Sequence, residues 1–255
     1  MTILGSQTHT VAWGNGTRIA MRRDGGPVPF LPLLGDSMGV VIETIAVTAG
    51  VLAVVRFLHA NSAPSLQWIA IPGVLVTAAL VPAWIRKREF PPVGLDLGHT
   101  GLVAATVGGV CAWVFPAVFL GLWVLTLLHL PLPLQPIIPE RQGWPAWLLY
   151  QFFYVAVAEE VFFRGYVQAN ATRLLSHSAR LPGVTPQHLA ILVSAGCFAL
   201  AHVVVQGQIT AVLTFLPGLV LAWLFLRTGS LLAPILFHGL ANVSYAVMAM
   251  TLARP

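Results

Sequence analysis

Residues 144–170 read WPAWLLYQFFYVAVAEEVFFRGYVQAN, an almost continuous run of apolar side chains. The hydrocarbon core of a bilayer is about 30 Å thick, and an α-helix of about 20 apolar residues crosses it. This run is long enough, but Glu159, Glu160 and Arg164 interrupt its apolar character. Ionisable side chains are costly at membrane depth and mark functional sites there. The stretch therefore predicts a transmembrane helix that carries part of a buried polar site.

The composition of the whole chain also indicates a membrane protein. Of the 255 residues, 57% are hydrophobic and only 8% are charged, and the mean hydropathy is +0.84. These fractions exclude a soluble globular domain, a disordered chain, a disulfide scaffold and a collagen-like fibre. The formal net charge is +5, yet the Lys and Arg residues are not interleaved with aromatic residues as in a nucleic-acid surface. We therefore expect the lipid bilayer, and no nucleic acid, as a partner.

Seven stretches of the sequence are long and apolar enough to cross a membrane, so we predict an all-α, polytopic integral membrane protein. The third stretch is the longest and contains Pro116, which kinks or divides a helix. Division there would raise the number of transmembrane helices from seven to eight. The predicted stretches are Met38–Leu58, Leu66–Ile85, Gly101–Leu130, Trp144–Asn170, Leu189–Val205, Ile209–Leu226 and Leu231–Leu252.

The positive residues between these stretches predict the orientation of the chain. Lys and Arg concentrate in the short cytoplasmic loops of membrane proteins. Nine of them fall on one side, before the first stretch and after the second, fourth and sixth. We therefore expect a cytoplasmic N-terminus, in the cell membrane of a bacterium or an archaeon. The nine residues are Arg18, Arg22, Arg23, Arg86, Lys87, Arg88, Arg173, Arg180 and Arg227.

The two acids of the fourth stretch are predicted to differ in role. Successive residues of a helix point about 100° apart, so Glu159 and Glu160 face different directions. Glu160 precedes Arg164 by four residues, which is the favourable spacing and order for an ion pair within a helix. Glu159 then has no counter-ion on its own helix and is our candidate for a general base. The alternative is that all three residues form a structural ion cluster.

Two histidines and an asparagine on later stretches supply the other candidates. His202 lies in the fifth stretch, and His238 and Asn242 share one face of the seventh. Glu159 and His202 can then deprotonate a water that attacks a carbonyl, while His238 and Asn242 stabilise the oxyanion. Alternatively, Glu159 and both histidines can bind zinc. The sequence has no HExxH motif, so we favour a mechanism without a metal or other cofactor.

Three short motifs occur in order on three of the predicted helices. They are Glu159-Glu160-x-x-x-Arg164, Phe198-x-x-x-His202 and His238-x-x-x-Asn242. This order resembles that of the CPBP family of intramembrane proteases, which includes the type II CAAX prenyl endopeptidases and proteins of bacteriocin processing and self-immunity. The resemblance covers roughly Trp144–Met248.

The resemblance implies an intramembrane glutamic endopeptidase that forms no covalent acyl-enzyme. Glu159 matches the water-activating acid of the family and His202 matches its partner. His238 and Asn242 match the pair that stabilises the oxyanion. The residues expected to support the site are Glu160, Arg164 and Phe198.

The resemblance also implies a substrate class and a division of the chain. Substrates would be membrane-anchored or lipidated peptides, among them prenylated, CAAX-like ones. Residues 1–37 are expected to form a polar cytoplasmic tail, residues 38–143 the N-terminal transmembrane helices, and residues 144–252 the protease core. Two other functions also account for acids and histidines in a membrane. They are a proton-coupled transporter and a non-catalytic peptide-binding or immunity protein.

Two further sets of residues have predicted roles. Four polar side chains flank the acid pair and can hydrogen-bond water or the substrate backbone: Tyr150, Gln151, Tyr154 and Gln168. Three glycines are predicted to let helices approach one another closely: Gly218, Gly229 and Gly239.

Overall fold

The computed structural model describes the secondary structure of residues 9–12, 18–21, 30–86, 97–132, 143–178 and 185–252. Within these ranges, side chains are described from residue 38 onward, apart from residues 97–99 and 177–178. The chain forms two compact units, Met1–Glu43 and Thr44–Pro255.

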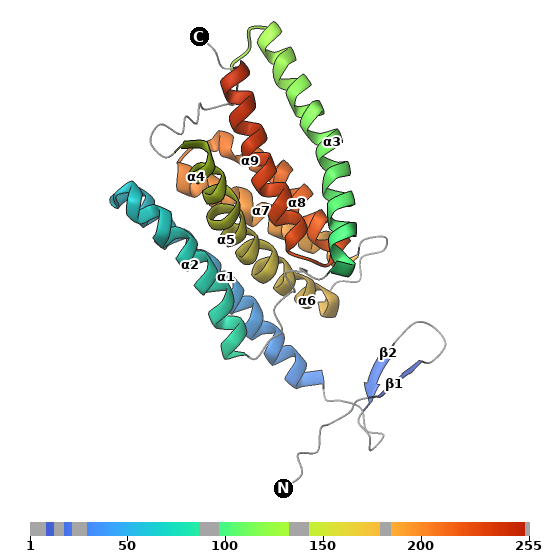
Figure 1. Ribbon diagram of the computed structural model, residues 1–255. Helices are drawn as coiled ribbons and strands as arrows, with labels where there is room; N and C mark the ends of the chain where they lie inside the picture. The colour runs from blue at the N-terminus through green and yellow to red at the C-terminus, as the bar shows by residue number, and fades with distance from the viewer. Residues whose placement is uncertain are drawn as a thin grey trace. The chain divides into compact units, whose positions relative to one another are not determined.

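The first unit contains a β-hairpin and the start of helix α1 (Phe30–Asn61). Strands β1 (His9–Ala12) and β2 (Arg18–Met21) pair antiparallel (Figure 1). The sequence predicts only a polar tail here, because four-residue strands are too short to show a period. Helix α1 also begins before the predicted Met38. Pro32 lies in the first turn, where its missing N–H costs no helical hydrogen bond, so the helix includes it.

Seven helices of the described residues are long and apolar enough to cross a membrane. Apart from the hairpin, this confirms the predicted all-helical fold, and the chain is an integral membrane protein. The third stretch is one helix with Pro116 in its interior, so the described residues support seven spans. After α1 the elements are α2 (Pro64–Ile85), α3 (Leu97–Leu127), α4 (Gly143–Leu149), η1 (Tyr150–Ala156), α5 (Val157–Glu160), η2 (Val161–Gln168), α6 (Ala169–Ser178), α7 (Pro186–Gln206), η3 (Ile209–Thr214), α8 (Phe215–Thr228) and α9 (Leu232–Leu252).

The fourth span, from α4 to α6, is a composite helix. Two π-helical segments, η1 and η2, lie on either side of the four-residue segment α5. In a π-helix each N–H donates to the carbonyl five residues earlier, a geometry that is rare and mostly occurs at functional sites. Glu159 and Glu160 are the last two residues of α5, so the acid pair lies at the junction with η2.

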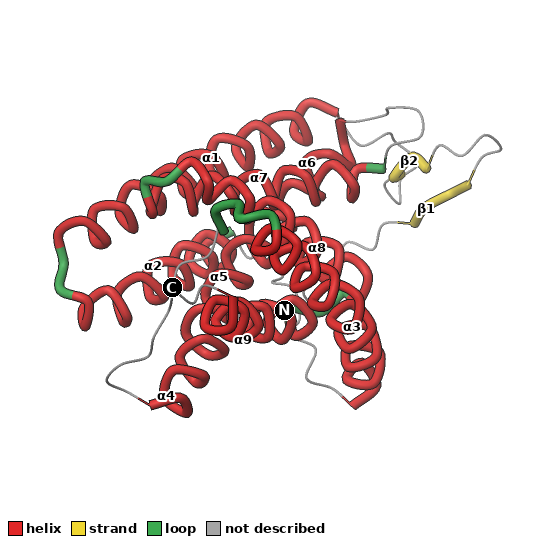
Figure 2. Tube along the Cα trace, turned by 90° about the horizontal axis from the view of Figure 1, so that it is seen from above, coloured by secondary structure: helices red, strands yellow, loops and turns green. Residues whose placement is uncertain are grey.

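Segment η2 lies at the centre of the second unit. Every residue from Phe162 to Gln168 is buried, and α2, α6 and α7 pack against this segment. Helix α5 lies between α2 and α9, and α3 lies along α9 (Figures 1 and 2). The acid pair is therefore surrounded by packed helices. The main apolar cluster includes Phe162, Phe163, Tyr166, Phe198, Leu224 and Phe237.

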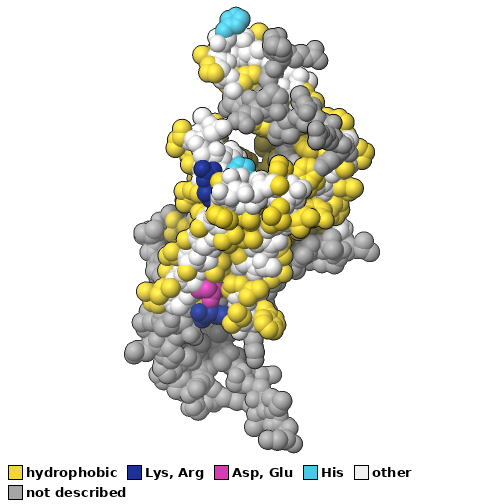
Figure 3. Space-filling view, turned by 90° about the vertical axis from the view of Figure 1, so that its left-hand side faces the viewer, with side chains coloured by type: hydrophobic (Ala, Val, Ile, Leu, Met, Phe, Trp, Pro, Cys, Tyr) yellow, Lys and Arg dark blue, Asp and Glu magenta, His cyan; other side chains and the backbone are white. Residues whose placement is uncertain are grey.

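The outer surface of the helices is mostly apolar. Figure 3 shows one face on which hydrophobic side chains cover most of the described surface and charged groups are few. Trp84 and Trp113 are 80% and 82% exposed, whereas Glu160, Arg164 and His238 are buried. This distribution is the reverse of that in a soluble protein and suits a helix bundle whose surroundings are lipid.

Glycines have two different roles in these helices. Gly207 and Gly229 follow α7 and α8 with φ of +69° and +66°, the left-handed conformation that ends a helix. The predicted close approach is wrong for Gly229, whose Cβ position would have no atom of another described segment within 4 Å. It is confirmed for Gly218, where a Cβ would lie 3.3 Å from the α7 backbone, and for Gly239, where a Cβ would overlap the Phe152 ring.

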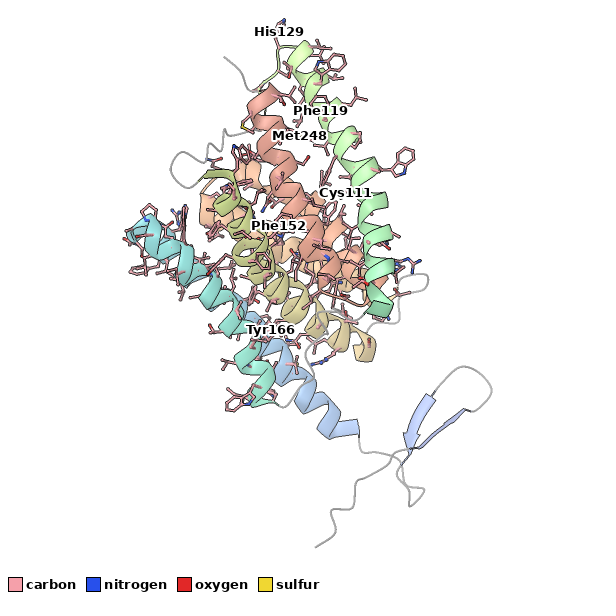
Figure 4. The ribbon with its side chains drawn as sticks, viewed as in Figure 1. Cys111, Phe119, His129, Phe152, Tyr166 and Met248 are labelled. Carbon is pink, nitrogen blue, oxygen red and sulfur yellow. The ribbon has the colours of Figure 1, made fainter. Side chains whose placement is uncertain are left out.

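Replacing Gly239 with Ala is expected to push α9 away from η1, because the new Cβ would overlap the ring of Phe152 (Figure 4). Overpacking of this kind costs about 1–3 kcal/mol, so we expect a lower Tm of the detergent-solubilised protein. Gly73→Ala on α2 is the matched control, since its Cβ would meet open space. Equal Tm values for Gly239→Ala and the wild type would contradict the prediction.

Candidate active site

A buried ion pair lies at the start of η2. Arg164 Nη1 donates to Glu160 Oε1 at 2.9 Å, and both side chains are fully buried. Arg164 Nη2 donates to the Gly218 carbonyl of α8 at 3.1 Å. The guanidinium carbon lies 4.7 Å from the ring centre of Phe198 on α7. The pair predicted from the four-residue spacing is confirmed, and it connects the fourth span to α7 and α8.

His238 of α9 contacts both acids of the fourth span. Its Nδ1 lies 2.7 Å from Glu160 Oε1, so Nδ1–H donates to that carboxylate. Its Nε2 lies 3.8 Å from Glu159 Oε2, which is close but beyond a direct hydrogen bond. Spacing along one helix predicts only Arg164 as a partner of Glu160. The second partner, His238, lies 78 residues further along the chain, and no local sequence pattern predicts this contact.

The charges of this cluster can balance. Buried charges are tolerated when they are paired, whereas an unpaired one is strongly destabilising. With His238 doubly protonated, the two cations Arg164 and His238 offset the two carboxylates Glu159 and Glu160. In that form Nε2 also carries a hydrogen. The cluster can therefore present an N–H donor on the Glu159 side of the ring.

The two acids differ in their exposure and in their hydrogen bonds. Glu160 is fully buried, and its Oε1 accepts hydrogen bonds from both Arg164 and His238. The Glu159 side chain is 20% exposed. Oε2 of each acid is buried and accepts no hydrogen bond from the part of the chain that the structure describes. Glu159 is thus the partly exposed acid of the pair, which another molecule can reach. Its role as a general base stays a prediction.

His202 of α7 has a defined proton arrangement. Its Nδ1 lies 2.9 Å from the Phe198 carbonyl oxygen, which can only accept, so Nδ1 carries the hydrogen. In the neutral ring, Nε2 then has a lone pair and can accept a proton. The rings of His202 and His238 lie 4.4 and 5.9 Å from the ring centre of Phe198. Phe198 therefore brings together two histidines that the sequence places on separate helices.

Asn242 lies one turn beyond His238 on α9. Its Nδ2 donates to Gln151 Oε1 on η1 at 2.8 Å. A carboxamide nitrogen carries two hydrogens, so one remains for another acceptor. The sequence predicts that Gln151 hydrogen-bonds water or the substrate backbone. Its partner Asn242 is not predicted, although two amides in separate spans are a pattern typical of interhelical hydrogen bonds.

The alternative zinc set is not assembled in this structure. Among the described residues, no group of three His, Cys, Asp or Glu side chains is arranged to hold a metal ion. Glu159, His202 and His238 therefore do not fit a zinc site in this geometry. The expectation of a mechanism without a metal stays a prediction.

Comparison with known protein families identifies the segment that holds these residues. Residues 141–244 match the family model described as Type II CAAX prenyl endopeptidase Rce1-like. This segment is similar to that family. The resemblance found in the motifs is thereby confirmed, over nearly the same residues as predicted. No curated protein and no solved structure matches the chain.

The Rce1-like segment contains every candidate residue of the site. It runs from just before α4 to just beyond Asn242 and so includes the fourth span, α7, α8 and most of α9. Helices α2 and α3 lie outside it but pack against η2 and α9. The family description places the segment among proteases, which are hydrolases of peptide bonds.

Proposed function

We propose that this protein is an intramembrane endopeptidase that cleaves a membrane-associated peptide with water activated by Glu159 and His202. The observation that carries the proposal is the position of His238. Its ring faces both carboxylates of the fourth span and shares the Phe198 ring with His202. Side chains of the fourth span, α7 and α9 thus support the proposal.

Glu159 and His202 supply the acceptors for the first step. The Glu159 carboxylate takes a proton from a water molecule as the water oxygen attacks the scissile carbonyl carbon. His202 Nε2 accepts a hydrogen bond from the same water and orients it. This part of the proposal is supported by the partial exposure of the Glu159 side chain and by the hydrogen bond that places the hydrogen of His202 on Nδ1.

His238 and Asn242 supply the donors that stabilise the oxyanion. The carbonyl π electrons move to oxygen during the attack, and the Nε2–H of His238 and the second Nδ2–H of Asn242 donate to that oxygen. Each such donor contributes about 10²–10³ in kcat. When the carbonyl re-forms, the C–N bond breaks and Glu159 returns its proton to the leaving nitrogen. Glu160 and Arg164 keep His238 oriented through its Nδ1–H.

We expect the substrate to be a membrane-anchored or lipidated peptide, including prenylated CAAX-like ones. The apolar outer surface and the family description support this substrate class. For a CAAX-like peptide the cut would fall just after the prenylated cysteine. The N-terminus is proposed to lie in the cytoplasm.

A cleavage assay in lipid vesicles tests the function. The purified protein is reconstituted and incubated with a peptide that ends in a prenylated CAAX sequence, and with the same peptide without the prenyl group. Mass spectrometry then measures the cut products. We expect cleavage after the modified cysteine in the first peptide only. Binding or uptake of the peptide without any cut product would favour the non-catalytic protein or the transporter.

Adding a chelator to the same assay is expected to leave the cleavage rate unchanged. The residues proposed to activate water are a carboxylate and an imidazole, which need no metal. The measurement is the initial rate with and without millimolar chelator. A loss of cleavage that added zinc restores would show that the metal-free mechanism is wrong.

A further inference from the structure

We infer that Gln151 is a positioning residue of this site, which orients the Asn242 carboxamide toward the oxyanion. The inference rests on the proposed function. Its basis is the 2.8 Å hydrogen bond from Asn242 Nδ2 to Gln151 Oε1, which joins residues 91 positions apart. Both side chains are half-buried, at the face where α9 meets η1.

A carboxamide has two orientations that exchange its oxygen and its nitrogen, and only one of them presents N–H to a given point. In this structure Gln151 Oε1 pairs with Nδ2 of Asn242. While Gln151 presents its oxygen to α9, only this orientation of the Asn242 carboxamide makes the hydrogen bond. One hydrogen of Nδ2 is held by Gln151, and the second remains free to donate to the oxygen of the substrate.

Packing at the same face fixes the distance between the two amides. Phe152, the residue after Gln151, lies on η1 (Figure 4). A Cβ at Gly239 would overlap its ring. Gly239 and Asn242 are three residues apart on α9 and share a face. Phe152 and Gln151 therefore meet the same face of α9, one by apolar contact and the other by a hydrogen bond.

On its other side, the start of η1 contacts α2. The ring of Tyr150 lies 5.1 Å from that of Trp68, measured between ring centres. Segment η1 is thus held between two helices. The position of the Gln151 oxygen is consequently fixed, and the Asn242 amide orients its N–H toward it.

A purely structural hydrogen bond is the alternative, and the same span offers a matched example. Gln168 Nε2 donates to the Ala222 carbonyl of α8 at 3.0 Å, and its side chain is buried. The contact with water or the substrate backbone that the sequence predicts for Gln168 is therefore wrong. No proposed catalytic group takes part in that bond. Gln168→Met therefore reports the effect of losing a buried glutamine contact alone.

The test compares kcat, KM and Tm in the vesicle cleavage assay. We expect Gln151→Met, which keeps the length but removes the acceptor, to lower kcat about tenfold with KM within about twofold, because one oxyanion donor is disordered.

Gln151→Glu keeps an acceptor oxygen and should retain at least about half of kcat. Gln168→Met should lower Tm with kcat within about twofold of wild type. In an Asn242→Ala background, Gln151→Met should cause less than about a twofold further loss.

Several results would overturn the inference. One is an unchanged kcat in Gln151→Met. Another is a tenfold loss of kcat that Gln151→Met also causes in the Asn242→Ala background. A third is a loss of kcat in Gln168→Met that equals the loss in Gln151→Met. Should Gln151→Met not fold, Gln151→Glu decides, because a tenfold lower kcat in that variant contradicts the role. Failure of the proposed function differs from failure of the Gln151 role. In the first case the wild-type protein cuts no peptide, and the inference fails with the function.

Discussion

Replacing Glu159 with Ala is expected to lower kcat for peptide cleavage by about 10³-fold, within the range of general-base catalysis. Glu159 is the partly exposed acid of the pair, and its Oε2 lies 3.8 Å from His238 Nε2. Without it, His202 alone accepts a proton from water, and no carboxylate returns a proton to the leaving nitrogen. The measurement is the initial rate of the reconstituted variant on the prenylated peptide.

Glu159→Gln is the matched control for this substitution. It keeps the size and polarity of the side chain but is not a base, so we expect the same loss as for Ala. Both variants should keep the Tm of the wild type within a few degrees, since Arg164 still pairs with Glu160 and a neutral His238 ring balances the remaining charges while keeping its Nδ1–H bond. Cleavage within about tenfold of wild type would contradict the role of Glu159. Intact transport or peptide capture by a protein that never cuts would favour one of the rival functions.

Replacing Arg164 with Met is expected to destabilise the protein by about 3–5 kcal/mol, the usual cost of leaving one member of a buried ion pair. Glu160 would lose its 2.9 Å partner in a fully buried position, and His238 would then face both carboxylates with one cation fewer in the cluster. The Gly218 carbonyl of α8 would lose a donor as well. The free energy of unfolding in mixed detergent micelles, followed by circular dichroism, measures the effect.

The double variant Glu160→Gln, Arg164→Met separates the charge effect from a packing effect. Gln has no charge and still offers an oxygen to His238 Nδ1–H, so we expect it to recover at least half of the lost stability. If the double variant is as unstable as Arg164→Met, the loss comes from packing around Phe198 and not from the uncompensated negative charge.

The transmembrane helices were predictable because each depends on a local property. A run of apolar residues long enough to cross lipid appears directly in the sequence, as it does around Pro116, where one helix continues through the proline. The Glu160–Arg164 pair was also predictable, since residues four apart meet on any helix. The three ordered motifs identified the family segment for a similar reason, because they name residue types at fixed spacings.

The contacts between helices were not predictable from spacing. Nothing local relates Glu160 to His238 or Gln151 to Asn242, because those pairs depend on how helices far apart in the chain pack. The π-helical segments were missed because a shift from a four-residue to a five-residue hydrogen bond leaves the apolar pattern almost unchanged. Gly229 was misread since a helix end and a helix contact can both select glycine.

One carboxylate oxygen of Glu160 holds an arginine and a histidine at once, and the arginine also holds the backbone of α8. Separating the fourth span, α8 and α9 would leave charged side chains unpaired in an apolar medium that solvates them poorly. These helices consequently resist separation. Thermal or mechanical unfolding of the bundle should begin at helices that take no part in these contacts.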